Sequence, residues 1–195
     1  MEEPREPYRR ESPIHGPGAD EIGRPIDASF VLARTKTLGI AVRGIRVFSS
    51  GCVIEIGFIL RRTDETAAQW QQMTDAAFGG RFGHRPSKDA LLFGVALSDG
   101  TAARTSDHFH RDQPDDAPHL TSTGGHSGSS GTERLHGSTD LWLRPLPPLP
   151  SMDIVCAWPA LGLDETRHTI DTTAIHRAAA DAHWFWPEDA ELPDN

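Results

Sequence analysis

Two histidines separated by one residue are the side chains of this 195-residue chain that are best placed to hold a metal ion. On a strand, His108 and His110 would point to the same side and could bind one ion, with His119 or Asp112 completing the site. Against this, histidines are scattered along the chain, no cysteine pair accompanies these two, and the segment around them is polar. We therefore expect a solvated loop and no cofactor here, with a metal site at His108 and His110 as the alternative.

Motifs that would indicate catalysis are weak. Residues 125–128 (Gly-His-Ser-Gly) resemble a nucleophile elbow, but the second glycine comes one position early, and an elbow lies between a strand and a helix rather than in a Gly/Ser-rich segment. No phosphate-binding loop, dinucleotide fingerprint or zinc-protease motif occurs. Four carboxylates could supply an acid and a base only if two of them faced each other across a cleft: Asp153, Asp164, Glu165 and Asp171. We name no catalytic residue and do not expect an enzyme.

An aromatic ring beside a guanidinium group is the best candidate for a binding surface. Leu141 and Leu143 alternate with Trp142 and Arg144, so if the two leucines face the core, Trp142 and Arg144 lie on the outer face of a strand. A Trp–Arg pair there would make a contact patch for another protein. The other interpretation, which we favour, is that the C-terminal helix covers Trp142.

The two cysteines allow two interpretations. Cys52 and Cys156 each lie within an apolar strand pattern, and Trp158 is close to Cys156 in sequence. In immunoglobulin-type domains a disulfide beside a tryptophan joins the two sheets. The N-terminal residues lack the apolar stretch of a secretory signal, so we expect two buried thiols in a reducing cytoplasm.

Short strands are the elements that would position these side chains. A bulge at Gly44 would place Ile40, Val42, Ile45 and Val47 on the same side of one strand. Alternation of apolar and polar residues predicts strands over residues 29–35, 38–48, 52–60, 91–97, 101–106, 141–144, 152–158 and 165–170.

The same alternation predicts which strand faces form the core. Residues 49–51 (Ser-Ser-Gly) and 99–100 (Asp-Gly) are hairpin signals that join neighbouring strands. We expect the core on the faces that carry Cys52, Ile54, Ile56, Phe58, Leu60, Leu91, Phe93, Val95, Leu97, Ile154 and Trp158.

Two helices and a proline-rich crossover complete the predicted elements. Residues 66–78 form a short helix, and Asp171 caps a second helix over residues 172–183. Prolines make residues 144–151 an extended, polyproline II-like crossover. We expect residues 184–186 (Trp-Phe-Trp) to dock the chain end on the fold.

These elements predict a mainly β protein, an antiparallel β-sandwich that could be immunoglobulin-like, with a short inserted helix and a C-terminal helix packed on it. We divide the chain into a disordered tail over residues 1–28, a single domain over residues 29–187, and an acidic tail over residues 188–195. Within the domain, residues 107–137 are predicted to form a flexible loop rich in Gly, Ser and His.

One pattern carries a resemblance to a known family. The resemblance covers residues 134–187 well and residues 29–105 by strand pattern only, and the family has a glycine where residues 149–151 (Leu-Pro-Ser) stand here, so we expect a differently shaped crossover. The chain resembles a family of uncharacterised actinobacterial proteins in Trp142-x-x-Pro145-Leu146-Pro147-Pro148, Trp158-Pro159-x-x-Gly162, Glu165, Asp171-x-x-x-Ile175-x-x-Ala178-Ala179 and Trp186-Pro187. The family has no established activity, so the resemblance implies a fold rather than a function.

Charge and hydrophobicity exclude two classes of partner. The net charge of −9 argues against binding of the nucleic acid backbone, which requires clustered Lys and Arg. No apolar run approaches the roughly 20 residues that cross a bilayer. We therefore expect a non-enzymatic cytoplasmic domain that binds another protein. The alternative is an enzymatic or metal-dependent module that uses the loop around His108 and His110.

Overall fold

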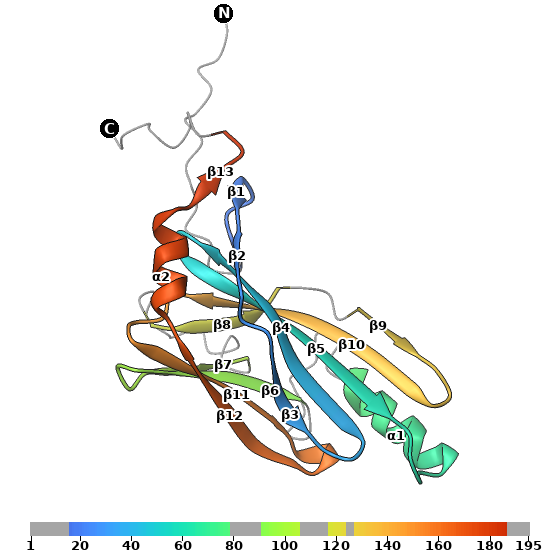
Figure 1. The fold of residues 1–195 in the computed structure, drawn as a ribbon. Coiled ribbons are helices and arrows are strands. Elements are labelled where there is room, and N and C mark those ends of the chain that lie inside the picture. Colours follow the sequence, from blue (N-terminus) through green and yellow to red (C-terminus); the bar gives the residue numbers. More distant parts are fainter. Residues whose placement is uncertain (1–15, 79–90, 106–116, 124–126, 187–195) are drawn as a thin grey trace, which may run out of the picture.

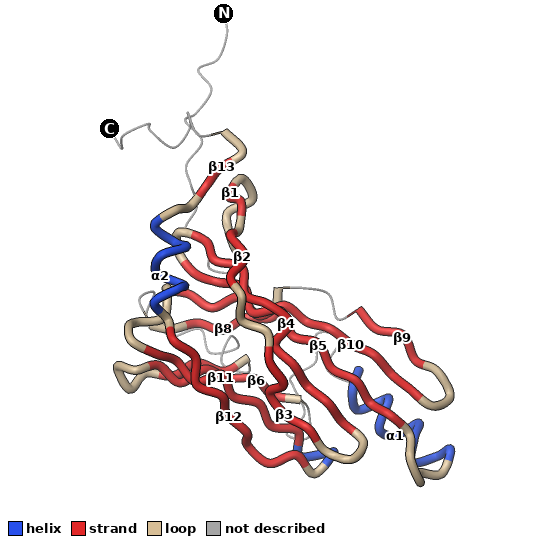
Figure 2. The backbone as a smooth tube through the Cα atoms, viewed as in Figure 1, coloured by secondary structure: helices blue, strands red, loops and turns tan. Residues whose placement is uncertain are grey.

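The protein is mainly β, with antiparallel sheets and two α-helices (Figures 1 and 2). The computed structural model describes residues 16–78, 91–105, 117–123 and 127–186. In this part of the chain, no helix is long and apolar enough to cross a bilayer.

The larger sheet has seven strands, all paired antiparallel. β4 and β5 are its long central pair, and β3 and β9 make additional pairs with β4 and β10. Its members are β2 (Arg24–Ile26), β3 (Phe30–Arg34), β4 (Leu38–Phe48), β5 (Gly51–Arg61), β8 (His119–Ser122), β9 (Ser127–Ser130) and β10 (Arg134–Arg144).

The smaller sheet has four antiparallel strands, in the order β12-β11-β6-β7. A separate two-stranded ribbon joins the start of the described chain to its end. These six strands are β1 (Glu21–Ile22), β6 (Leu92–Leu97), β7 (Ala102–Arg104), β11 (Ser151–Trp158), β12 (Leu163–Asp171) and β13 (His183–Trp184).

The two sheets share one hydrophobic core, which gives the molecule its sandwich-like layering (Figure 1). The predicted core residues are all buried except Leu91, which is half-buried. β3 lies beside β11 and β12, where the ring of Phe30 stacks on that of His168 with a centroid distance of 3.8 Å. β3 therefore pairs with the larger sheet and also contacts the smaller one.

The predicted bulge at Gly44 is confirmed. The register between β4 and β5 shifts between Val42 and Gly44. As a result Ile40, Val42, Ile45 and Val47 are all buried in the same core, although their spacing is not that of a regular strand.

The inserted helix α1 (Ala67–Phe78) starts with a capping box. The Thr66 hydroxyl accepts the backbone N–H of Gln69 at 3.3 Å, and the Gln69 side chain accepts the N–H of Thr66 at 2.9 Å. Trp70 is buried and donates its indole N–H to the carbonyl oxygen of Gly131 at 3.2 Å. The helix is thereby fixed to the turn before β10.

The C-terminal helix α2 (Thr173–Ala180) is shorter than the predicted residues 172–183. Thr172 is its N-cap, but the side chain of Asp171 still accepts the backbone N–H of Thr173 at 2.7 Å. The hydrogen bond from the Thr173 side chain, and then this backbone hydrogen bond, lower the pKa of Asp171. Buried Ile175 joins α2 to the core beside β2 and β4.

Three sequence predictions about the irregular parts need correction. The fold begins before residue 29, because β1 and β2 lie within the predicted tail. β8, β9 and the first residues of β10 lie within the predicted flexible loop over residues 107–137. The proline-rich crossover has cis peptide bonds at Arg144–Pro145 and Leu149–Pro150, unlike an all-trans polyproline II helix. A 3₁₀ turn, η2 (Pro159–Leu161), follows β11.

The predicted docking of the chain end is wrong for two of its three aromatic residues. Trp184 is half-buried in β13, where it pairs with Glu21. Phe185 and Trp186 are 63% and 58% exposed, because the ribbon of β1 and β13 extends away from the sheets (Figure 1).

Two glycines of the larger sheet should respond in opposite ways to substitution by alanine. A Cβ atom at Gly137 would lie 2.1 Å from the Phe58 ring in the core, whereas one at Gly39 would meet nothing within 4 Å. We expect Gly137→Ala to lower the free energy of unfolding by about 1–3 kcal/mol through overpacking, and Gly39→Ala to leave it unchanged or raise it by up to about 1 kcal/mol. Urea denaturation measures both, and equal effects would contradict the assignment of the two faces.

Candidate functional site

The predicted metal-binding histidines lie outside the residues that the structure describes. His108 and His110 fall in residues 106–116, together with Asp112. His119 is half-buried on β8, opposite Arg144 of β10. Among the described residues, no group of three or more His, Cys, Asp or Glu side chains is arranged to hold a metal ion.

Trp142 does not form a surface patch with Arg144. Its side chain is fully buried in a small cluster with Phe48 and Val53, and its ring meets that of Phe48 edge to face with centroids 5.7 Å apart. The predicted Trp142–Arg144 binding patch is therefore wrong, because Trp142 is not on the surface. Among the described residues, the buried cluster that holds this ring consists of Phe48 and Val53 from the β4–β5 hairpin and includes no residue of α2, which differs from the favoured interpretation.

Two of the four predicted carboxylates, Asp153 and Glu165, form a charge network on the smaller sheet. Arg167 contacts Glu165 at 2.6 Å and Asp153 at 3.4 Å, and the Thr169 hydroxyl donates to Asp153 at 2.6 Å. Glu165 raises the pKa of Arg167, with a smaller contribution from Asp153. Each carboxylate in this network has a cation or hydroxyl partner, so the network does not show an acid and a base facing each other across a cleft.

The two cysteines are free thiols, as favoured from the sequence. Desolvation by burial raises the pKa of Cys52 to about 12 and that of Cys156 to about 11. Because the thiolate is the reactive form, neither residue is suited to act as a nucleophile or to bind a metal ion at neutral pH.

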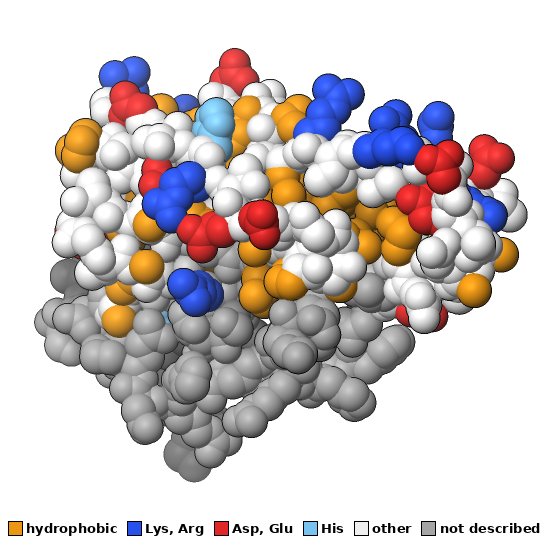
Figure 3. Space-filling model, turned by 90° about the horizontal axis from the view of Figure 1, so that it is seen from below, with side chains coloured by type: hydrophobic (Ala, Val, Ile, Leu, Met, Phe, Trp, Pro, Cys, Tyr) orange, Lys and Arg blue, Asp and Glu red, His pale blue; other side chains and the backbone are white. Residues whose placement is uncertain are grey.

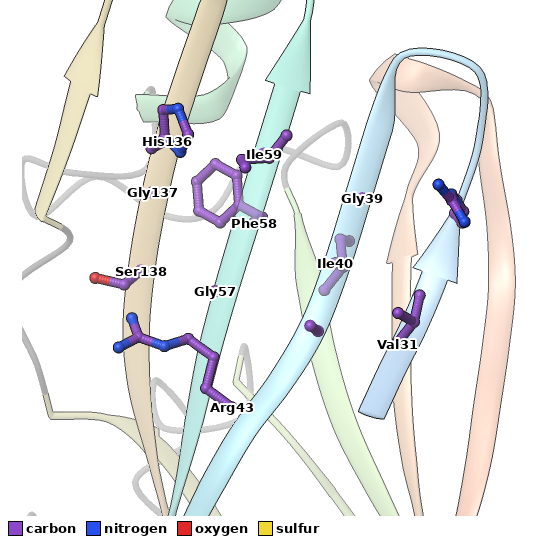
Figure 4. Close-up of a pocket in the computed structure, with 12 residues that line it drawn as sticks. Val31, Gly39, Ile40, Arg43, Gly57, Phe58, Ile59, His136, Gly137 and Ser138 are labelled. Atoms are coloured by element: carbon purple, nitrogen blue, oxygen red, sulfur yellow. The ribbon is translucent and has the colours of Figure 1, made fainter. Parts of the chain in front are cut away.

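A hollow among the described residues lies on the outer face of the larger sheet, across β3, β4, β5 and β10. It has a volume of about 860 Å³. Val31 and Ile59, which are 61% and 42% exposed, are the aliphatic side chains that border it. Figure 4 shows the labelled residues of this groove on β4, β5 and β10, together with Val31 on β3.

Small side chains in register make the floor of the groove. Ala41 pairs with Val31 on one side and with Gly57 on the other, and Gly57 pairs with Ser138. In the next row Gly39 pairs with Ile59, which pairs with His136. Because large side chains are missing from adjacent positions of neighbouring strands, the sheet surface is hollowed between Val31 and Ile59.

Arg43 is exposed, and its side chain lies across the floor of the groove. A Cβ atom at Gly57 would lie only 2.6 Å from Cδ of Arg43, so the absence of a side chain at Gly57 lets the arginine cross β5. Its guanidinium group is directed towards Ser138 on β10 (Figure 4). The sequence gives no direct signal for this arrangement.

One end of the groove is bordered by a charged row. Arg46 donates to Glu55 at 2.7 Å and lies 3.5 Å from Asp140. Glu55 pairs with Asp140 two residues beyond the pair of Gly57 and Ser138, whereas Arg46 pairs with Val53. Glu55 and Asp140 therefore already share a cation.

The lining of the groove is cationic and apolar. It contains Arg34, Arg43 and His136 but no Asp or Glu. Neither arginine makes an ion pair or a side-chain hydrogen bond with any residue in the described ranges. Such a surface can hold an apolar group and an anionic group side by side.

The sequence analysis missed this groove, although part of its signal is present. The alternation that buries Ile56 and Phe58 also places Gly57 and Ile59 on the opposite face of β5. What the sequence did not show is that Ala41 and Ser138 lie on either side of Gly57.

Comparison with known proteins gives no further assignment. No family model, no curated protein and no solved structure matches the chain.

The thiols should make stability fall at alkaline pH. The unfolded chain ionises its cysteines near pH 8.5, whereas the folded values are about 11 and 12. The stability that the neutral thiols contribute is therefore complete below about pH 8.5 and is lost as the pH rises towards these folded values, at up to about 1.4 kcal/mol per pH unit for each thiol.

Urea denaturation between pH 7 and 10.5 measures this loss. The control is Cys52→Ala/Cys156→Ala, which carries every other titrating group and should lose less stability over the same range. A native protein that reacts rapidly with a thiol reagent at pH 7 would contradict the burial of both groups.

Proposed function

We propose that this protein is a non-enzymatic interaction domain that binds a segment of a partner protein in the groove on the outer face of its larger sheet. The observation that carries the proposal is the groove itself, a hollow of about 860 Å³ between exposed Val31 and Ile59 over a floor of small residues. Exposed apolar surface that is hollowed and rimmed by polar groups is typical of interaction sites.

The position of the groove on a rigid sheet supports this function. Its lining comes from β4, β5 and β10, whose backbones are held by long antiparallel ladders, and from β3 at the side. A surface fixed in this way loses little conformational freedom when a partner binds. A partner would cover Val31 and Ile59, fill the space above Ala41 and contact the Arg43 side chain that lies over Gly57.

The location that we propose is the cytoplasm. Cys52 and Cys156 are both free and buried, and unpaired thiols fit a reducing compartment. The alternative function, a metal-dependent or enzymatic module, depends on His108 and His110, and no observation on the described residues favours it.

A peptide selection with a matched pair of variants tests the proposal. A random 12-residue peptide library displayed on phage is selected against the full chain. Ala41→Ile fills the floor of the groove, and Ala96→Ile makes the same change at another half-buried alanine, on β6 of the smaller sheet. We expect selected peptides to bind Ala41→Ile at least about tenfold more weakly, a loss of ~1.4 kcal/mol, and to bind Ala96→Ile like the original protein.

Fluorescence polarisation of labelled peptides gives the affinities, and thermal unfolding shows that both variants are folded. Selected peptides that bind Ala41→Ile unchanged, or a selection that enriches no peptide, would overturn the groove as the binding site.

A further inference from the structure

We infer that the partner segment is acidic as well as apolar, with one carboxylate on each side of an apolar residue; this inference rests on the proposed function. The apolar residue would lie between Val31 and Ile59. The carboxylates would pair with Arg43 on one side of the groove and with Arg34 on the other.

Arg43 is the stronger of the two anchors. Its side chain lies flat over Gly57, with Cγ, Cδ and Nε all within 3.8 Å of the position of an added Cβ. The guanidinium group, directed towards Ser138, is therefore at the level of the floor (Figure 4). Guanidinium groups bind carboxylates through two parallel hydrogen bonds, so an acidic side chain entering the groove would meet a positioned partner.

Arg34 supplies the second positive charge from the opposite side. It pairs with Gly39, and this row continues through Ile59 to His136 on β10. Three strand spacings separate β3 from β10, which is about 14 Å. Roughly four residues of extended chain span this distance, so we expect the two carboxylates to be about three to five residues apart in the partner segment.

The surrounding charges favour an anion at these two points. The Arg46 guanidinium already holds both Glu55 and Asp140. No carboxylate lines the groove itself, and neither lining arginine is paired within the described ranges. Electrostatic complementarity of this kind determines specificity and the rate of association more than it determines affinity.

The small extent of the positive surface favours a short acidic segment over nucleic acid. The chain as a whole carries a net charge of −9, and the groove contributes only two arginines and one histidine. On the face of the molecule seen in Figure 3, Asp and Glu side chains lie close to the Lys and Arg side chains among the residues that are drawn in colour. Nucleic acids need a continuous basic stripe along their backbone.

The test uses the peptides selected against the full chain and compares two arginines. Arg43→Gln removes the charge in the groove, and Arg177→Gln removes an exposed charge in the last turn of α2 as the matched control. We expect the selected peptides to contain Asp or Glu on both sides of an aliphatic residue. They should bind Arg43→Gln about 10- to 100-fold more weakly and Arg177→Gln within about twofold, the range expected for loss of a charge-assisted hydrogen bond.

A charge exchange shows whether the contact is direct. Arg43→Glu should bind the original peptide even more weakly, and it should regain affinity when the acidic residue nearest to Arg43 is replaced by lysine. Raising the salt concentration from 50 to 500 mM should weaken the original complex and leave peptides with Asn or Gln at both acidic positions unaffected.

The outcomes separate this inference from the proposed function. Neutral selected peptides that require Ala41 but tolerate Arg43→Gln would overturn the acidic partner and leave the groove as the binding site. Binding that is insensitive to Ala41→Ile would overturn both. A 12-nucleotide single-stranded DNA that binds more tightly than the selected peptides, with loss on Arg43→Gln, would also overturn the inference, because it would assign the arginines to a nucleic acid.

Discussion

The pairing of β5 with β4 on one side and β10 on the other is the interaction on which the rest of the structure depends. All three strands are eleven residues long, and their ladders place every second side chain in the core. Ile54, Ile56 and Phe58 of β5 pack there against the smaller sheet, and Phe58 meets Trp158 edge to face at a centroid distance of 5.8 Å. The same alternation places Gly57 and Ile59 outside.

Glycine positions on the two faces have opposite roles in this sheet. On the inner face, Gly137 leaves room for the ring of Phe58, so that the core is filled from the neighbouring strand. On the outer face, Gly57 leaves room for the side chain of Arg43, and no apolar group fills the remaining space. The filled core and the open groove therefore both depend on a glycine that lies beside a long side chain of a neighbouring strand.

Trp142 belongs to a small buried cluster that is separate from the main core. Trp142 points away from the main core, but the hairpin between β4 and β5 brings Phe48 and Val53 onto it. Gly51 makes this approach possible, because a Cβ atom there would lie 2.7 Å from the Trp142 ring. The groove lies farther along the same three strands, where Ala41, Gly57 and Ser138 line it.

The sequence by itself determined the local structure: the apolar alternation of the long strands, the bulge at Gly44 and the faces that form the core. These features depend on side-chain period and on neighbours along the chain. Only the tertiary structure decided what covers Trp142, that Phe185 and Trp186 remain exposed, and that Ala41, Gly57 and Ser138 meet in one row. Those outcomes depend on how strands pair, including β10 with β5, which are distant in sequence. The period of one strand shows which of its side chains share a face, but it does not identify the residue that lies opposite on a distant strand.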